Sequence, residues 1–147
     1  MIDAAQRDLD DSDASLLDTA VRLARQAIPD CVAYCVVDMP TTTMISIATA
    51  QGHPASLDQL PDATTYLFRG EDLRTVESVL QGSRRDRSDN RRDFGEIVVL
   101  SEDFLHLFMR APTRPDTAVV AVCRSSVNLG LALAKARSSL HGVEDAI

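Results

Sequence analysis

The chain has 147 residues, 45% of them hydrophobic, which is typical of one globular domain with a substantial core. Its formal net charge of −7 disfavours binding to nucleic acids or to anionic membranes. No apolar run approaches the roughly 20 residues of a membrane helix, and the acidic N-terminus does not resemble a signal or transit peptide. We therefore expect a cytoplasmic protein.

The N-terminal segment divides into an acidic part and an amphipathic part. Residues 1–13 are rich in aspartate and are predicted to form a flexible tail. Apolar residues recur at helical spacing from Ala14 to Ile28, and Pro29 then prevents further helix. The pattern predicts one domain over residues 14–142, which begins with this helix, and a second short tail at 143–147.

Two strands are predicted after the helix. Cys31 to Asp38 is almost wholly apolar, which indicates a buried strand. Met44 to Ala50 is more polar, so we place it at a sheet edge. Asp38 could serve as a catalytic acid, but an aspartate just before Met39 and Pro40 is more typical of a turn.

The cysteines are all embedded in apolar segments. In a regular strand Cys31 and Cys35 would lie on one face about 13 Å apart, too far for one metal ion or one disulfide. Cys123 lies in another apolar run. We expect all three to be reduced packing residues.

A longer helix is predicted from about Asp62 to Gln81, with Gly82 at its end. Gly70 lies in the middle of its apolar stripe. Two readings stay open: a break into two helices, or the close approach of another helix where the glycine has no side chain. The segment from Ser83 to Asp93 holds five arginines and three aspartates, and we expect a mobile solvated loop there rather than a nucleic-acid site.

Three further strands are predicted in the last third of the chain. Glu96 to Leu100 is so apolar that it indicates a strand covered on both faces. Phe104 to Arg110 alternates, and Ala118 to Val122 is almost free of polar residues, as expected for the middle of a sheet. The prolines between Ala111 and Asp116 indicate a loop. The alternation places one set on one face, Leu105, Leu107 and Met109, and the other set on the opposite face, Phe104, His106, Phe108 and Arg110.

A closing helix is predicted from Ser125 or Ser126, either of which could cap it, to Gly142. The element order is then α-β-β-α-β-β-β-α. We expect an α/β protein of the α+β kind, with a five-stranded, mainly antiparallel sheet between helices.

Little in the sequence indicates catalysis. It contains no glycine-rich phosphate loop, HExxH or CxxC motif, and its histidines lie in different settings. His106, between Phe104 and Phe108, could titrate in an apolar setting, but we favour a packed, hydrogen-bonded side chain. We therefore predict a protein that is not an enzyme, with no catalytic residue, no metal and no cofactor.

The balance of helices and strands predicts a dimer. The first and last helices can cover one sheet face, but the middle helix, about 10 Å wide, cannot cover the other face alone. The strand from Glu96 to Leu100 would also leave an apolar edge. A second copy could supply another middle helix and pair its own edge strand, and the two helices could cross at Gly70.

At this point the chain resembles the Roadblock/dynein light-chain family over about Leu16 to Leu140. Val119 to Arg137, VVAVCRSSVNLGLALAKAR, is similar to the apolar strand and helix start of such domains. Leu67 to Leu80, LFRGEDLRTVESVL, is similar to the middle helix of some bacterial members. The resemblance implies a profilin-like sheet between helices, and dimers built through the middle helix and third strand into one continuous sheet.

The resemblance also implies a regulatory or scaffolding role in bacterial motility or signalling, often through a small Ras-like GTPase. We expect a homodimer, or a dimer with a paralogous Roadblock-like chain. Stimulation of a GTPase would need an exposed arginine, for which Arg69, Arg74 and the loop arginines are candidates. The alternative is a small-molecule sensor with a PAS- or GAF-like sheet. The expected dimer and partner surface is formed by Tyr66, Arg69, Gly70, Leu73, Val76, Glu77, Leu80, Ile97 and Val99.

Overall fold

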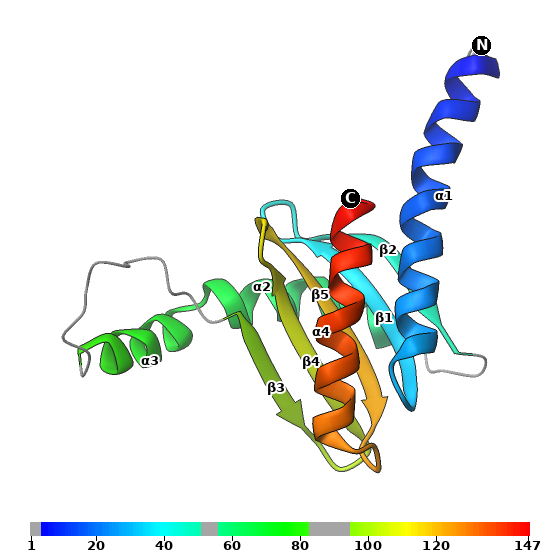
Figure 1. Cartoon of the computed structure of the whole chain (residues 1–147). Helices are drawn as coiled ribbons and strands as arrows, with labels where there is room; N and C mark the ends of the chain where they lie inside the picture. The colour runs from blue at the N-terminus through cyan, green and yellow to red at the C-terminus, as the bar shows by residue number, and fades with distance from the viewer. Residues whose placement is uncertain (1–3, 51–55, 83–94) are drawn as a thin grey trace.

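The computed structural model describes residues 4–50, 56–82 and 95–147. The predicted arginine-rich loop at 83–93 lies outside these ranges. The element order is the predicted one, except that the middle helix is two helices preceded by one short 3-10 turn (Figure 1). The elements are α1 (Ala4–Ala27), β1 (Cys31–Asp38), β2 (Thr43–Thr49), η1 (Ser56–Gln59), α2 (Leu60–Arg69), α3 (Glu71–Gly82), β3 (Glu96–Leu100), β4 (Phe104–Ala111), β5 (Arg114–Arg124) and α4 (Leu129–Asp145).

The strands form one five-stranded sheet in the order β2-β1-β5-β4-β3, and all neighbours are antiparallel. The α+β prediction is therefore confirmed, with β5 in the middle and β2 at an edge. The predicted loop from Ala111 to Asp116 is shorter, because β5 already begins at Arg114. Arg114 pairs with Ala111 of β4, so the backbone is already extended at this residue. Pro115 follows it near the start of the strand, where a residue without an amide proton is tolerated.

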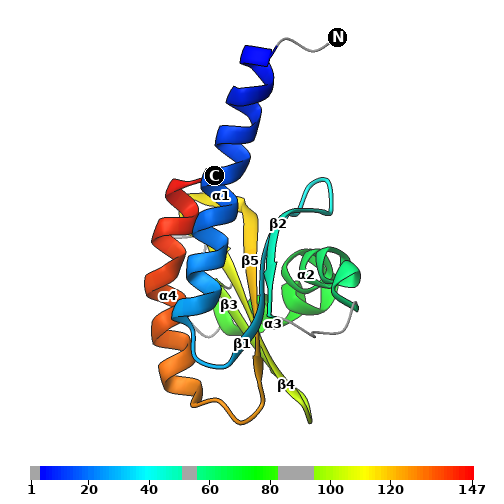
Figure 2. The same cartoon turned by 90° about the vertical axis from the view of Figure 1, so that its right-hand side faces the viewer.

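The first and last helices cover one face of the sheet, as predicted. Figure 2 shows α1 and α4 on the same side of it. Their buried residues, including Val21, Ala136 and Leu140, pack in one cluster with Leu105 and Leu107 of β4. The alternating pattern of β4 thus places its leucines on the α1/α4 face.

On the opposite face α2 packs over β1, β2 and β5. Leu60 and Phe68 of this helix are buried in a second cluster with Phe108 and Val120. Arg110 of β4 binds the end of α2, because its guanidinium lies 5.0 Å from the ring centroid of Phe68 and donates to the Phe68 carbonyl at 3.3 Å. The two clusters place the core on both faces of β1 and β5.

The ends of the outer helices differ from the prediction. α1 begins at Ala4, so the predicted tail at 1–13 is helical from that residue onward. Alanine, arginine, glutamine and leucine favour a helix there despite the aspartates. In Figure 1 this first part of α1 extends beyond the sheet.

The C-terminal helix is shifted in the same way. Asn128, not Ser125 or Ser126, is its N-cap, and the side chain accepts a hydrogen bond from the Leu131 amide at 2.9 Å. The helix passes through Gly142 to Asp145, so residues 143–147 are not a tail. Val143 is only 1% exposed, and burying it offsets the cost of a helical glycine, about 1 kcal/mol.

The cysteines are buried and free, as predicted, but the predicted shared face of two of them is wrong. Cys31 belongs to the α1/α4 cluster and Cys35 to the α2 cluster. The β1–β5 register shifts between Cys31 and Ala33. This irregularity reverses the alternation of side chains, because one extra residue turns each following side chain to the other face.

Candidate interaction surface

The middle helix breaks at Gly70, and the break fixes the direction of α3. The Gly70 amide donates to the Tyr66 carbonyl at 2.8 Å. A Cβ atom on residue 70 would lie 2.4 Å from that same oxygen, so only glycine fits there without a shift. Of the two readings of this glycine, the structure supports the break.

A polar contact spans the break. The Tyr66 hydroxyl donates to Asp72 Oδ2 at 2.8 Å, joining the end of α2 to the first turn of α3. The hydrogen bond to Asp72 and its negative charge raise the pKa of Tyr66, because both stabilise the protonated phenol. Tyr66 remains 62% exposed as a residue.

Beyond the break, α3 leaves the sheet (Figure 1). Leu73 packs partly against the α2 cluster. Val76, Val79 and Leu80 are 49%, 70% and 46% exposed. Residues three and four apart share one helix face, so α3 presents an apolar strip to solvent.

The edge strand β3 presents a second apolar strip. The prediction that it is covered on both faces is wrong, because Val98, Val99 and Leu100 are 42%, 40% and 67% exposed. The reason is its place at the edge of the sheet, away from β1, β2 and β5, over which α2 mainly packs. Ile97 and Val99 pair with Phe108 and with His106, so they face the α2 side.

An ion pair holds β3 to the helix behind it. Arg137 of α4 donates to both carboxylate oxygens of Glu96, Nη2 to Oε1 at 2.6 Å and Nε to Oε2 at 2.7 Å. This hydrogen-bonded guanidinium lowers the pKa of Glu96. The pair fixes the first residue of β3 while the outer edge of the strand stays open.

The candidate arginines differ in their surroundings. Arg69 forms an ion pair with Asp116 at 2.5 Å, which joins the end of α2 to β5. Arg74 lies on α3 and is exposed. The loop arginines lie outside the residues that the structure describes. Arg74 is thus the described candidate on the same helix as the apolar strip.

The predicted surface residues lie on α3, on β3 and at the C-terminal end of α2. Figure 1 shows α3 and β3 toward the same end of the molecule. The prediction missed Val79, the most exposed apolar residue of α3, which lay beside the predicted stripe. It also missed Val98 and Leu100, whose side chains face the α4 side.

The two candidate catalytic residues, Asp38 and His106, both make contacts that hold the fold together. Asp38 Oδ2 accepts hydrogen bonds from the amide and the hydroxyl of Thr41, so it closes the turn before β2. His106 stacks on Phe108 with 6.1 Å between ring centroids and meets the edge of Phe104 at 6.4 Å. Within the described ranges no cluster of three or more His, Cys, Asp or Glu could hold a metal ion.

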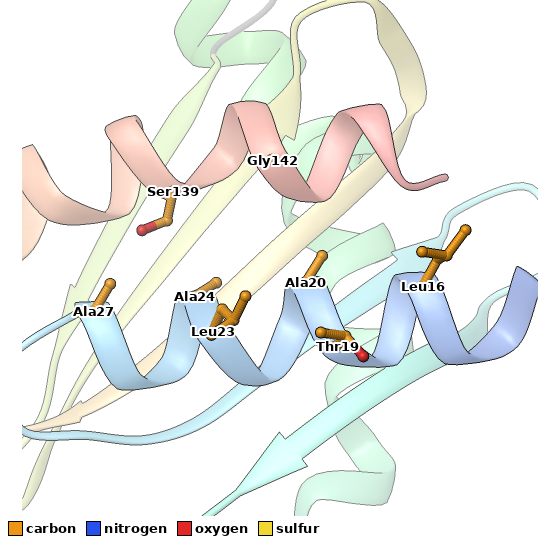
Figure 3. Close-up of a pocket in the computed structure, with 8 residues that line it drawn as sticks. All are labelled: Leu16, Thr19, Ala20, Leu23, Ala24, Ala27, Ser139 and Gly142. Atoms are coloured by element: carbon orange, nitrogen blue, oxygen red, sulfur yellow. The ribbon is translucent and has the colours of Figure 1, made fainter.

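Two grooves open at the surface beside α1. One, about 540 Å³, lies between α1 and α4, and Figure 3 shows Ala20, Ala24 and Ala27 on one side of it and Ser139 on the other. The second, about 570 Å³, lies between α1 and β2. Among the described helices, none is long and apolar enough to cross a membrane.

No family model matches this sequence, and neither does any curated protein. Solved structures do match. A Roadblock/LC7 domain from Streptomyces avermitilis has a TM-score of 0.64 at 13% identity, covering 87% of this chain and 94% of that one. The gliding protein MglB from Thermus thermophilus has a TM-score of 0.66 at 13% identity, covering 92% and 90%.

A further MglB structure, described as having a tetrameric arrangement, has a TM-score of 0.70 at 13% identity. It covers 92% of this chain and 93% of that one. At these identities the likeness shows the fold. The chain therefore has the Roadblock/LC7 fold, and the resemblance predicted from Val119–Arg137 and Leu67–Leu80 is confirmed at that level.

Proposed function

We propose that this chain is a non-enzymatic regulatory adaptor that dimerises, with itself or with a paralogous Roadblock-like chain, through α3 and β3. The dimer binds a small Ras-like GTPase or another signalling or motility protein. The observation that carries the proposal is the open end of the sheet, where the apolar strips of α3 and β3 have no cover among the described residues.

An apolar edge strand supports pairing with another chain. Its last three residues are apolar and exposed, and no charge or proline interrupts them. Natural sheets protect such edges, since unpaired backbone groups join other strands. Pairing of β3 with β3 of a second copy would give one continuous sheet across a two-fold axis.

The strip on α3 supports the same assembly. Val76, Val79 and Leu80 cover little of their own sheet, because α3 makes its main contact with α2. Across a two-fold axis each α3 could lie over the partner's open end. A stable interface of this kind buries on the order of 2,000 Å² in total.

The regulatory role rests on the fold and on what its structural neighbours are. One neighbour is a gliding protein and another has a tetrameric arrangement. Glu96 of β3 and Arg69 at the end of α2 have partners in ion pairs. We infer that the surface binds proteins rather than transforming a substrate.

The dimer is tested by placing a charge in the α3 strip. Val76→Glu and Leu73→Glu are expected to give monomers or aggregates, because a buried unpaired carboxylate opposes association. Size-exclusion chromatography with light scattering measures the mass. Leu16→Glu, at an exposed apolar site on α1, is the control for Val76→Glu and should leave the mass unchanged. An unchanged dimer in both α3 variants contradicts the interface.

The adaptor role is tested by capture from the native cytosol. The intact chain and Val76→Glu are each immobilised, and retained proteins are identified by mass spectrometry. A small GTPase retained by the intact chain, and lost with Val76→Glu but not Leu16→Glu, supports the proposal. Hydrolysis assays with that GTPase then separate activation from tethering, and Arg74→Ala tests for stimulation. Retention of no GTPase or other signalling protein contradicts the role.

A further inference from the structure

The second edge of the sheet, β2, is also open, and it has a different character from β3. Among the described strands β2 pairs only with β1, and it contains seven residues, none of them charged or proline. Its register shifts at Ile45, but the stretch from Ser46 to Thr49 is regular. Ile45 and Ile47 are 43% and 40% exposed. Such an edge carries little of the usual protection against strand addition.

The backbone groups that face outward can be assigned. The Ala50 amide donates to the Val32 carbonyl at 2.7 Å, so it points toward β1. In an antiparallel pair the amides of a strand alternate between inward and outward directions. The amides and carbonyls of Ile47 and Thr49 therefore point away from the sheet, where they can bind another backbone.

Basic side chains of α1 lie beside this edge. The groove of about 570 Å³ between α1 and β2 is lined by Asp18, Arg22, Arg25 and the residues of β2. Asp18 accepts a hydrogen bond from the Ser46 hydroxyl at 2.6 Å. One carboxylate thus faces two guanidinium groups, and the groove has a positive balance in a chain whose net charge is −7.

The two arginines of this groove still have N–H groups that can donate further hydrogen bonds. Arg25 Nη1 donates to the Cys31 carbonyl at 3.2 Å, and Arg22 Nη2 donates to Thr19 Oγ1 at 3.4 Å. Neither forms an ion pair with a described residue. Each guanidinium has five N–H donors and binds a carboxylate through two of them.

We propose that an extended acidic segment of another protein binds here as an added strand on β2. Its backbone pairs with the outward groups of Ile47 and Thr49, and its carboxylate side chains bind Arg22 and Arg25. This mode takes affinity from main-chain hydrogen bonds and specificity from alternate side chains. A second copy does not fit, because pairing β2 with β2 would bring the arginines of both copies together.

The test uses a synthetic peptide of alternating glutamate and valine, as long as β2, with a fluorescent label. Fluorescence anisotropy measures its binding to the intact chain. Saturable binding that weakens with salt is expected, and a peptide with lysine in place of glutamate should not bind. Arg22→Glu should weaken binding by about tenfold or more, because repulsion replaces attraction. Equal binding of the lysine peptide, an unaffected Arg22→Glu variant, or no binding at millimolar peptide overturns the proposal.

Two further measurements separate strand addition from attraction by charge alone. Hydrogen exchange should show new protection of the Ile47 and Thr49 amides when the glutamate peptide binds. Ile47→Pro removes an outward donor and should abolish binding. Peptide binding without new protection of the β2 amides overturns the strand geometry. This exchange measurement uses the intact chain, so it decides the question even if Ile47→Pro fails to fold. Val76→Glu should keep peptide binding, so the result is independent of the α3/β3 dimer.

Discussion

At the scale of single residues, the three thiols have different surroundings although all are buried. Burial raises the pKa of Cys35 to about 12. Cys31 and Cys123 are cross-strand partners of β1 and β5. A hydrogen bond from the Cys123 thiol lowers the pKa of Cys31 and raises that of Cys123.

These surroundings predict an order of reactivity. At pH 8 in the folded protein, Cys31 should react first with iodoacetamide, because it has the lowered pKa and is 6% exposed, against 0% for Cys35 and Cys123. Cys35 should react only after unfolding. Mass spectrometry of timed samples measures the order. Early labelling of Cys35 contradicts its buried position.

A buried hydroxyl gives a second prediction at this scale. Tyr34 is fully buried, and within the described part of the chain its hydroxyl has no hydrogen-bond partner. Tyr34→Phe should leave the free energy of unfolding unchanged or raise it by up to about 1 kcal/mol, since folding removes this hydroxyl from water without replacement. Urea denaturation measures it.

Leu107→Ala is the positive control for this measurement. Leu107 is 1% exposed in the α1/α4 cluster, and its truncation should lower the free energy of unfolding by about 2–5 kcal/mol. A loss above about 1 kcal/mol for Tyr34→Phe would show that the hydroxyl does form a stabilising contact.

At the scale of elements, the direction of α3 depends on its break from α2. Gly70→Ala should disturb the break, because the added Cβ meets the Tyr66 carbonyl oxygen. We expect a loss of about 1–3 kcal/mol in the free energy of unfolding, typical of overpacking, and a weaker dimer. Thermal unfolding and light scattering measure both. Ser78→Ala, at an exposed site on α3, is the control and should change neither.

The link between β3 and α4 gives a pH-dependent prediction. Arg137 lowers the pKa of Glu96 in the folded protein, so the ion pair stabilises the fold above the ordinary pKa of a glutamate. The contribution is lost as pH falls through the lowered folded value. Glu96→Gln should therefore be slightly less stable than the intact chain at pH 7, and the difference should shrink once the pH falls below the ordinary pKa of a glutamate and disappear in stronger acid. A difference that persists in acid contradicts this assignment.

The sequence predicted the strands better than the ends of the helices. Alternation correctly placed Leu105, Leu107 and Met109 together on one face, because a strand repeats every two residues. Helix ends depend on tertiary contacts, and the burial of Val143 carries α4 past Gly142. The opposite faces of Cys31 and Cys35 depend on a register shift that no local pattern announces.

The candidate surface was only partly predictable. The apolar run from Glu96 to Leu100 indicated a strand covered on both faces, but it lies at a sheet edge with its last three residues exposed, because composition alone does not distinguish an edge strand from a central one. Val79 was missed because the helical stripe was drawn for one continuous helix. The break at Gly70 turns α3 away from the sheet, which exposes this residue.

At the scale of the whole molecule, the two sheet faces differ in cover. Two helices, α1 and α4, cover one face, whereas on the other α2 packs mainly over β1, β2 and β5 and contacts β4 through Phe68. The end of the sheet at β3, together with α3, remains apolar and exposed. We propose that two copies share this end, each covering what the other leaves open.

Small-angle X-ray scattering of the intact chain at micromolar concentration tests this claim most directly. We predict a mass twice the 16.0 kDa of one chain and an elongated particle, as expected for two sheets joined end to end. A compact particle of 16.0 kDa at these concentrations would contradict it.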